Sequence, residues 1–312
     1  MRIIVPTRPP FSFEQTLAFV RRFPPSSGSI VVGGGSLYAA VAHGGRAQAF
    51  TLRMQGGELV ADVRAAAVAR RAAELVGARD DLGALYAAAE TDPPFAALVR
   101  RLYGLHHVRF LGLEDIAVYC VLMQRTPMRL ATRFKQRFLD RFGLVAEVAG
   151  HTLRAVPDLA TLAELDAADI AEALGHRAKA ERIVAVVRGV AALGEPFLRE
   201  APYAEARRAL LAIPGIGPFS AGAILLRGLG RMDELPSLDL FERDARVIYG
   251  RAWNPRAIAR RYGDQIGYWS FYVKTGAARL SSGTSSSSAC SRPSRAATGR
   301  ADPRRSRDSS RA

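Results

Sequence analysis

One segment of the chain combines a glycine turn with a downstream aspartate, and these two features could together bind phosphate and cleave a sugar bond. The turn is Pro214-Gly215-Ile216-Gly217, which lies between two apolar helix patterns. Glycine tolerates positive φ, so such a turn can present bare amide N–H groups at the start of the second helix. Amides placed there bind phosphate without reading base sequence. Taken alone, the pattern is equally compatible with an ordinary helical hairpin.

The aspartate is Asp239, which follows a Pro-containing turn within Glu234-Leu-Pro-Ser-Leu-Asp-Leu240. An Asp in front of a helix is commonly its N-cap, and amides at a helix start also stabilise the ionised carboxylate. Beside an anomeric carbon, a carboxylate stabilises the developing positive charge of the sugar and can guide water. We therefore interpret Asp239 as a helix cap and as the catalytic residue of a glycosidic cleavage.

The stretch from residue 209 to 240 resembles the helix-hairpin-helix, Gly/Pro-rich loop and aspartate signature of the DNA glycosylase superfamily. In that family the aspartate follows the second residue after the hairpin's Gly-x-Gly by about twenty positions, and Phe219 precedes Asp239 by twenty. Upstream, 119–127 resembles the family's buried helix with a Gln-containing wedge loop. Residues 174–182 resemble the segment in which a Gly precedes a basic residue at a helix start. The resemblance spans roughly residues 90–275.

Within the superfamily the chain is most similar to 3-methyladenine DNA glycosylase II, whose members carry an N-terminal β-sheet domain. The resemblance implies an enzyme that flips a damaged base, expected to be an alkylated purine, out of duplex DNA and hydrolyses its N-glycosidic bond. Bifunctional relatives place a Schiff-base Lys at the position of Phe219, so lyase activity is not expected. The four-Cys cluster of other relatives is missing, since Cys120 and Cys290 are the only cysteines, and neither a disulfide nor a zinc site is expected.

The resemblance also implies roles for residues around the hairpin and the wedge loop. The expected DNA contacts are Gly215, Ile216, Gly217, Phe219, Ser220, Gln124, Arg125, Arg177 and Lys179. Aromatic residues in helices are more often core, but candidates for stacking on the flipped base are Tyr119, Trp269 and Tyr272. Relatives bind a monovalent cation, Na⁺ or K⁺, through carbonyls that match Leu211, Ile213 and Ile216. No other cofactor is expected.

The elements that position these residues change character along the chain. Four short β-type runs separated by Gly pairs predict an antiparallel meander over 27–32, 36–42, 48–53 and 58–63, flanked by helices over 13–22 and 63–76. From about residue 92 helical periodicity dominates and no strand is predicted. The predicted helices cover 113–123, 130–142, 168–174, 178–193, 203–212, 219–229, 240–249 and 256–272.

The predicted fold class is α+β with three parts. An N-terminal antiparallel sheet and helix domain covers 1–90, and an all-α helix-hairpin-helix domain covers 91–278. The Ser- and Arg-rich segment 279–312 has almost no apolar residues and is expected to be disordered.

The charge of the chain indicates a polyanionic partner. The net charge is +15, of which 281–312 contribute +5 (seven Arg, two Asp), leaving +10 on the rest. No run reaches the roughly 18 apolar residues of a membrane span, and the N-terminus lacks a signal-peptide core. We expect a cytoplasmic, nucleoid-associated monomer that binds double-stranded DNA containing a damaged base.

Two alternatives stay open. The first is a glycosylase of the same fold that acts on an oxidised base such as 8-oxoguanine, which the absence of the Lys disfavours. The second is a non-catalytic helix-hairpin-helix DNA-binding protein, which the spacing of Asp239 disfavours.

Overall fold

The computed structural model describes residues 1–287 of the chain. Most of the segment predicted to be disordered therefore lies outside the described residues. Its first part, 279–287, continues the last helix, α15 (Ile266–Ser287). None of the described helices is both long enough and apolar enough to cross a membrane.

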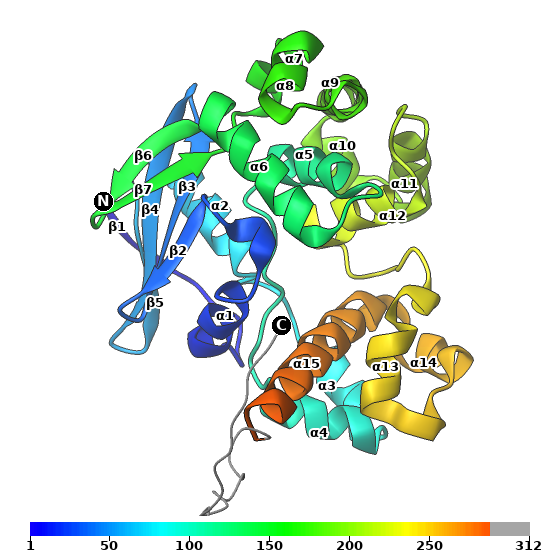
Figure 1. Ribbon diagram of the computed structural model, residues 1–312. Helices are drawn as coiled ribbons and strands as arrows, with labels where there is room; N and C mark the ends of the chain where they lie inside the picture. The colour runs from blue at the N-terminus through cyan, green and yellow to red at the C-terminus, as the bar shows by residue number, and fades with distance from the viewer. Residues whose placement is uncertain (288–312) are drawn as a thin grey trace, which may run out of the picture.

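The N-terminal part is built on a five-stranded antiparallel sheet in the order β1-β5-β4-β3-β2 (Figure 1). The predicted meander is confirmed, and paired glycines with positive φ make its turns. The strands are β1 (Arg2–Val5), β2 (Ile30–Gly33), β3 (Ser36–His43), β4 (Arg46–Gln55) and β5 (Glu58–Asp62). Strand β1 was not predicted, because four residues before a proline carry too little periodicity, and it is held by pairing with the distant β5.

Two helices of the N-terminal part bury the apolar residues of this sheet. Helix α1 (Phe13–Val20) starts at Ser12, whose hydroxyl accepts the Gln15 amide, and helix α2 (Ala66–Leu75) packs on β1, β3, β4 and β5. Their shared core includes Phe50, Leu52 and Leu75, which are almost fully buried.

A second antiparallel pair, β6 (Leu144–Val148) and β7 (His151–Ala155), lies inside the region predicted to be entirely helical. The expectation that no strand follows residue 92 was therefore wrong. The pair packs against β3 and β4, where Leu153 and Ala155 share a small core with Ala40 (Figure 1). A five-residue strand is too short for alternation of apolar and polar residues to stand out in the sequence. The apolar face of β6 and β7 becomes evident only where it packs against β3 and β4.

Helices account for most of the remaining chain. The helix predicted over 256–272 is broken at Gly263, where φ is +39° and a helix cannot continue. The α-helices are α3 (Gly83–Glu90), α4 (Pro93–Arg101), α5 (Leu113–Met123), α6 (Met128–Phe142), α7 (Leu159–Ala163), α8 (Ala167–Leu174), α9 (Arg177–Leu193), α10 (Glu195–Glu200), α11 (Tyr203–Leu211), α12 (Pro218–Ala223), α13 (Glu242–Tyr249), α14 (Pro255–Tyr262) and α15.

These helices form two clusters with separate cores. Helices α5 to α12 share one core, and α3, α4 and α13 to α15 share another. Leu82 and Leu85, which precede the predicted domain boundary at residue 90, pack in the second core with Trp269 and Tyr272. The division at residue 90 thus stays a prediction, and the second core draws residues from both sides of it.

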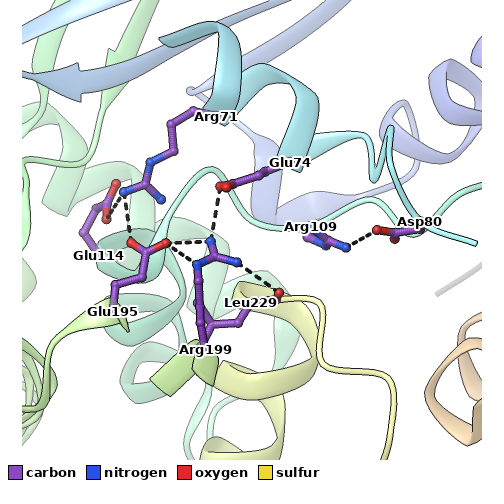
Figure 2. A network of polar contacts seen from close by, with 8 residues as sticks. All are labelled: Arg71, Glu74, Asp80, Arg109, Glu114, Glu195, Arg199 and Leu229. Carbon is purple, nitrogen blue, oxygen red and sulfur yellow. Dashed lines mark hydrogen bonds and ion pairs between the residues drawn. The ribbon is translucent and has the colours of Figure 1, made fainter. Parts of the chain in front are cut away.

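A network of charges joins the sheet part to the first helical cluster (Figure 2). Arg71 of α2 lies 4.0 Å from Glu114 of α5 and 3.4 Å from Glu195 of α10. Arg199 bridges Glu195 at 2.6 Å and Glu74 of α2 at 3.2 Å. Burial raises the pKa of Glu114 to about 6, and the nearby Arg71 offsets only part of that rise.

The substitution Glu114→Gln should stabilise the protein at neutral pH. The raised pKa means that the Glu114 carboxyl holds its proton more tightly in the native state than in the unfolded chain, where its pKa is near 4.5. The cost of the buried charge is therefore absent below about pH 4.5 and complete above about pH 6, and it amounts to roughly 1–2 kcal/mol. Urea unfolding should show the gain at pH 7.5 and little change at pH 4.5. The exposed Glu90→Gln is the control, and an equal gain at both pH values would contradict the prediction.

Candidate functional site

The hairpin between α11 and α12 forms as predicted. The Ile216 amide donates to the Ile213 carbonyl at 3.0 Å, and Gly215 has a φ of +96°, which favours glycine. The first hydrogen bond of α12 runs from the Ala221 amide to the Gly217 carbonyl. The amides of Phe219 and Ser220 precede that bond, so the helix itself offers them no acceptor.

Gln124 joins the wedge loop to the hairpin, two segments about ninety positions apart in the sequence. As the C-cap of α5, it donates from Nε2 to the Gly215 carbonyl at 2.7 Å and to the Ser220 hydroxyl at 3.5 Å. Its Oε1 accepts from Arg182 at 2.9 Å. Two segments predicted to share one function therefore meet in space, but Gln124 is tied to the hairpin in the free protein.

Arg125 is the exposed residue at the tip of the same loop. Its φ of +50° lies in the left-handed region, which a residue other than glycine seldom adopts. Such backbone strain often marks a functional position. Gln124 and Arg125 were both predicted to form the wedge. The exposed Arg125 side chain is the one of the two that can project from the surface toward DNA.

Lys179 occupies a different place from the one predicted. Its side chain is buried, and its ammonium donates to the carbonyls of Val121, Leu122 and Gln124 at 3.0, 3.1 and 2.9 Å. Desolvation and the nearby Arg182 lower its pKa. Lys179 thus caps the carbonyl groups at the C-terminal end of α5 and fixes the start of the wedge loop. Its prediction as a direct DNA contact is corrected for this reason. Arg177 is exposed and pairs with Glu181 at 2.7 Å.

Asp239 is exposed and belongs to a 3-10 turn, Leu238–Phe241, that leads into α13. The cap of this turn is Ser237, so the prediction that Asp239 is the N-cap is corrected. The Ser237 hydroxyl accepts the Asp239 amide N–H at 3.2 Å and lies 3.1 Å from Oδ2 of the same residue. Ser237 therefore orients the carboxylate, and the Ser two residues before the Asp was the signal for it.

The loop that leads to Asp239 packs against α12, the second helix of the hairpin. Gly222 has no space for a side chain because Pro236 lies against it. The helix continues past α12 as a π-helical segment, Ile224–Gly228, a rare feature that is frequent at functional sites. Phe219, Ala223 and Arg227 are the residues from 219 to 229 that are not buried, and their spacing of four places them on one face. Arg227 was not predicted, although a charge inside the apolar run 221–229 could have drawn attention to it.

Two of the three predicted stacking residues lie in the core. Trp269 and Tyr272 are fully buried, and the structure leaves no face of either ring open to a base. Trp269 donates to the Tyr249 hydroxyl, and Tyr272 donates to the Leu105 carbonyl, each at 2.9 Å. Their predicted role in stacking is corrected for this reason. Tyr119 is nearly buried beside Phe110 and donates to the Met128 sulfur, so its role stays a prediction.

Of the three carbonyls predicted to hold a monovalent cation, that of Leu211 lies at the end of α11, and those of Ile213 and Ile216 lie in the turn that follows. That of Ile213 already accepts the Ile216 amide, and a carbonyl has a second lone pair to offer. Among the described residues no group of three or more His, Cys, Asp or Glu side chains could hold a metal ion.

Comparisons of the sequence with curated proteins find similar DNA repair enzymes. The chain is 29% identical over 152 residues to a DNA-3-methyladenine glycosylase of Bacillus subtilis, which covers 48% of this chain and 50% of that protein. It is 28% identical over 188 residues to the probable bifunctional transcriptional activator/DNA repair enzyme AlkA of Mycobacterium tuberculosis, covering 56% of this chain and 37% of that protein. The chain thus spans half or less of the length of these relatives. No family model matches it.

Solved structures share the fold over nearly the whole chain. The 3-methyladenine DNA glycosylase from Archaeoglobus fulgidus aligns with a TM-score of 0.72 at 23% identity, covering 88% of this chain and 96% of that one. The 8-oxoguanine glycosylase/lyase of Clostridium acetobutylicum, solved with double-stranded DNA, aligns with a TM-score of 0.66 at 15% identity, covering 87% and 93%. The fold of this chain is that of the helix-hairpin-helix glycosylases, and its resemblance to 3-methyladenine DNA glycosylases is confirmed.

Proposed function

We propose that this protein is a monofunctional DNA glycosylase that excises damaged bases, chiefly alkylated purines, from double-stranded DNA. The observation that carries the proposal is that three segments meet at the hairpin. Gln124 of the wedge loop bonds to Gly215, and Pro236, in the loop that leads to Asp239, packs against Gly222. The names of the curated relatives supply the substrate class. In this reading the hairpin amides hold a phosphate, Arg125 fills the space left by the flipped nucleotide, and Asp239 stabilises the sugar cation.

The absence of an amine at position 219 defines the chemistry. Phe219 is 60% exposed and cannot form a Schiff base with the sugar. Water then completes the reaction, and the products are a free base and an intact abasic strand. The protein would act as a monomer at the nucleoid, with a Na⁺ or K⁺ ion held by the carbonyls of Leu211, Ile213 and Ile216 between the hairpin and a phosphate.

A panel of duplexes, each containing one lesion, tests the proposal. The wild-type protein should release a methylated purine as free base and leave the strand unbroken until it is treated with alkali. Strand nicking, or trapping of an enzyme–DNA adduct by borohydride, would reveal an amine nucleophile. Binding without release of any base would support a silent DNA-binding protein, and release of 8-oxoguanine alone would support the oxidised-base alternative.

The substitution Gly217→Ala should weaken binding to duplexes of every sequence by the same factor, about tenfold or 1.4 kcal/mol. A Cβ at Gly217 meets no atom within 4 Å in the free protein, so the variant should fold normally and the methyl group would crowd only the phosphate. Gly215→Ala is less informative, because its positive φ and the adjacent Arg182 side chain would disturb the turn itself. Fluorescence anisotropy with two unrelated duplexes measures the effect. A change in lesion preference at unchanged affinity would contradict this role.

A further inference from the structure

Helix α6 carries a row of exposed arginines that begins beside the wedge loop. The helix starts at Met128, three residues after Arg125 of that loop. Arginines then recur at every fourth position on its exposed side, which places them on neighbouring turns. The members of this arginine row are Arg129, Arg133, Arg137 and Arg141. In Figure 1 the helix runs from the side of α5 and α12 toward β6 and β7, so the row leads from the hairpin toward the sheet.

The other side of α6 is fixed in the protein. Phe134 is buried in the core that α6 shares with α5 and α9. The Met128 sulfur accepts a hydrogen bond from the Tyr119 hydroxyl at 3.1 Å, and the buried Lys135 pairs with Asp115 at 2.8 Å. These contacts set both the position and the rotation of the helix. The arginine row is therefore held on the surface by a rigid element.

No carboxylate neutralises the arginine row. None of its four members forms an ion pair among the described residues. The acid of α6, Asp140, lies 3.7 Å from Arg154 of β7 and accepts a hydrogen bond from Gln136 at 2.9 Å. Arg137 donates to the carbonyl of Leu174 at 3.3 Å, which leaves its charge without a counterion.

Other helices of the protein pair their exposed arginines with acids one turn away. Arg177 lies 2.7 Å from Glu181, and Arg246 lies 2.7 Å from Glu242. Helix α6 contains five basic residues and one acidic residue, and it lacks this arrangement along the row. Like charges on neighbouring turns repel one another, and a bound polyanion would relieve that repulsion.

The chemistry of the row indicates the phosphate backbone of DNA as its partner. A guanidinium group binds phosphate oxygens through two parallel N–H bonds. The centre of a protein interface is rich in aromatic and apolar residues, whereas the large exposed apolar residues of α6, Met128 and Leu130, lie only in its first turn. From Arg129 to Arg141 the row spans about 18 Å, which is the length of about five base pairs.

We propose that the arginine row of α6 is a second phosphate-binding surface, separate from the hairpin, which holds one arm of the duplex on the side of the N-terminal sheet. The inference rests on the proposed function, because the wedge loop sets where the DNA lies. The hairpin holds the strand at the flipped nucleotide, and the row holds the backbone several base pairs away. Phosphate contacts carry no sequence information, so this surface binds duplexes with and without a lesion alike.

The salt dependence of duplex binding tests the proposal on the full-length chain. A triple variant, Arg129→Gln with Arg133→Gln and Arg137→Gln, removes the three charges nearest the wedge loop and keeps good helix formers. Each lost phosphate contact lowers the slope of log affinity against log salt by about 0.9, so the slope should become shallower by about two to three. Between about 50 and about 200 mM salt, the affinity gap to the wild type should therefore narrow roughly fortyfold in anisotropy titrations.

The matched control removes three exposed arginines in and beside α2. Its substitutions are Arg64→Gln, Arg70→Gln and Arg79→Gln. Both triple variants lower the net charge by the same amount, so any effect of overall charge is common to them. The control should keep a slope within about 0.5 of the wild-type slope. An equal decrease in both variants would show attraction by net charge instead of contact and would overturn the inference.

Duplexes with unequal arms locate the surface. Each contains one lesion with about three base pairs on one side and about ten on the other, and two such duplexes place the short arm on opposite sides. The wild type should bind one of them more weakly by about tenfold or more, because only one arm reaches the row. The triple variant should bind both with similar affinity.

The outcomes distinguish this inference from the proposed function. If the wild type neither binds duplex DNA nor releases a damaged base, the proposed function fails. If it releases bases while the folded triple variant keeps the wild-type slope, the second surface is overturned and the glycosylase remains. If the triple variant does not fold, the wild type decides the question, because equal affinity for the two unequal duplexes would also overturn the surface.

Discussion

The substitution Asp239→Asn should slow base release by two to three orders of magnitude while DNA binding is retained. Asparagine has the size of aspartate, and its amide oxygen can still accept a hydrogen bond from Ser237, so the loop should keep its shape. The lost quantity is the negative charge that stabilises the sugar cation in the transition state. One such electrostatic contact is worth about 3–4 kcal/mol, which corresponds to this change in rate.

Because Asp239 is exposed in the free protein, its effect has to be measured on the chemical step with DNA bound. Water screens a carboxylate at the surface, and the full effect arises only when bound DNA excludes that water. Single-turnover excision with enzyme in excess isolates the chemical step, and anisotropy titration gives the affinity. Asp233→Asn is the control, because this carboxylate lies in the same loop but pairs with Arg231 at 3.3 Å. Normal excision by the Asp239→Asn protein would remove the central claim.

The substitution Lys135→Met should lower the free energy of unfolding by about 3–5 kcal/mol. Lys135 of α6 forms an ion pair with Asp115 of α5 at 2.8 Å, with 4% and 6% of the two side chains exposed. Its ammonium also donates to the carbonyl of Pro25, which joins the N-terminal part to the helical cluster. Methionine fills the same space but leaves the Asp115 carboxylate buried beside no cation, and the uncompensated charge is the source of the loss.

A double substitution separates the buried charge from the packing of the side chain. Lys135→Met combined with Asp115→Leu removes both charges and should recover most of the stability, because a buried pair replaced by apolar groups is often nearly neutral. Arg133→Met, on the exposed side of the same helix, should change the free energy of unfolding by less than about 0.5 kcal/mol. Urea unfolding measures all four proteins. A loss below about 1 kcal/mol for Lys135→Met would show that Asp115 finds water or another partner.

The sequence by itself determined the features that depend on neighbouring residues. The hairpin follows from Pro214, Gly215 and Gly217, since a tight turn needs residues that allow its backbone angles. The glycine pairs likewise predicted the turns of the sheet. The interval of twenty positions from Phe219 to Asp239 matched the signature of the DNA glycosylase superfamily, and this resemblance predicted that Asp239 is the catalytic carboxylate.

Tertiary structure alone decided which side of each element faces the site. Lys179 and Arg177 lie two positions apart at one helix start, yet packing against α5 buries the first and leaves the second exposed. Trp269 and Tyr272 are in the core, because α15 meets α3 and α4 from more than 150 residues away in the sequence. Arg227 is a charge in an apolar run until α1 and α15 bring three rings around it. Hydrophobic periodicity predicts which face of a helix a residue occupies. The burial and hydrogen bonds of that residue depend on the element packed against the face, and distant parts of the chain supply that element.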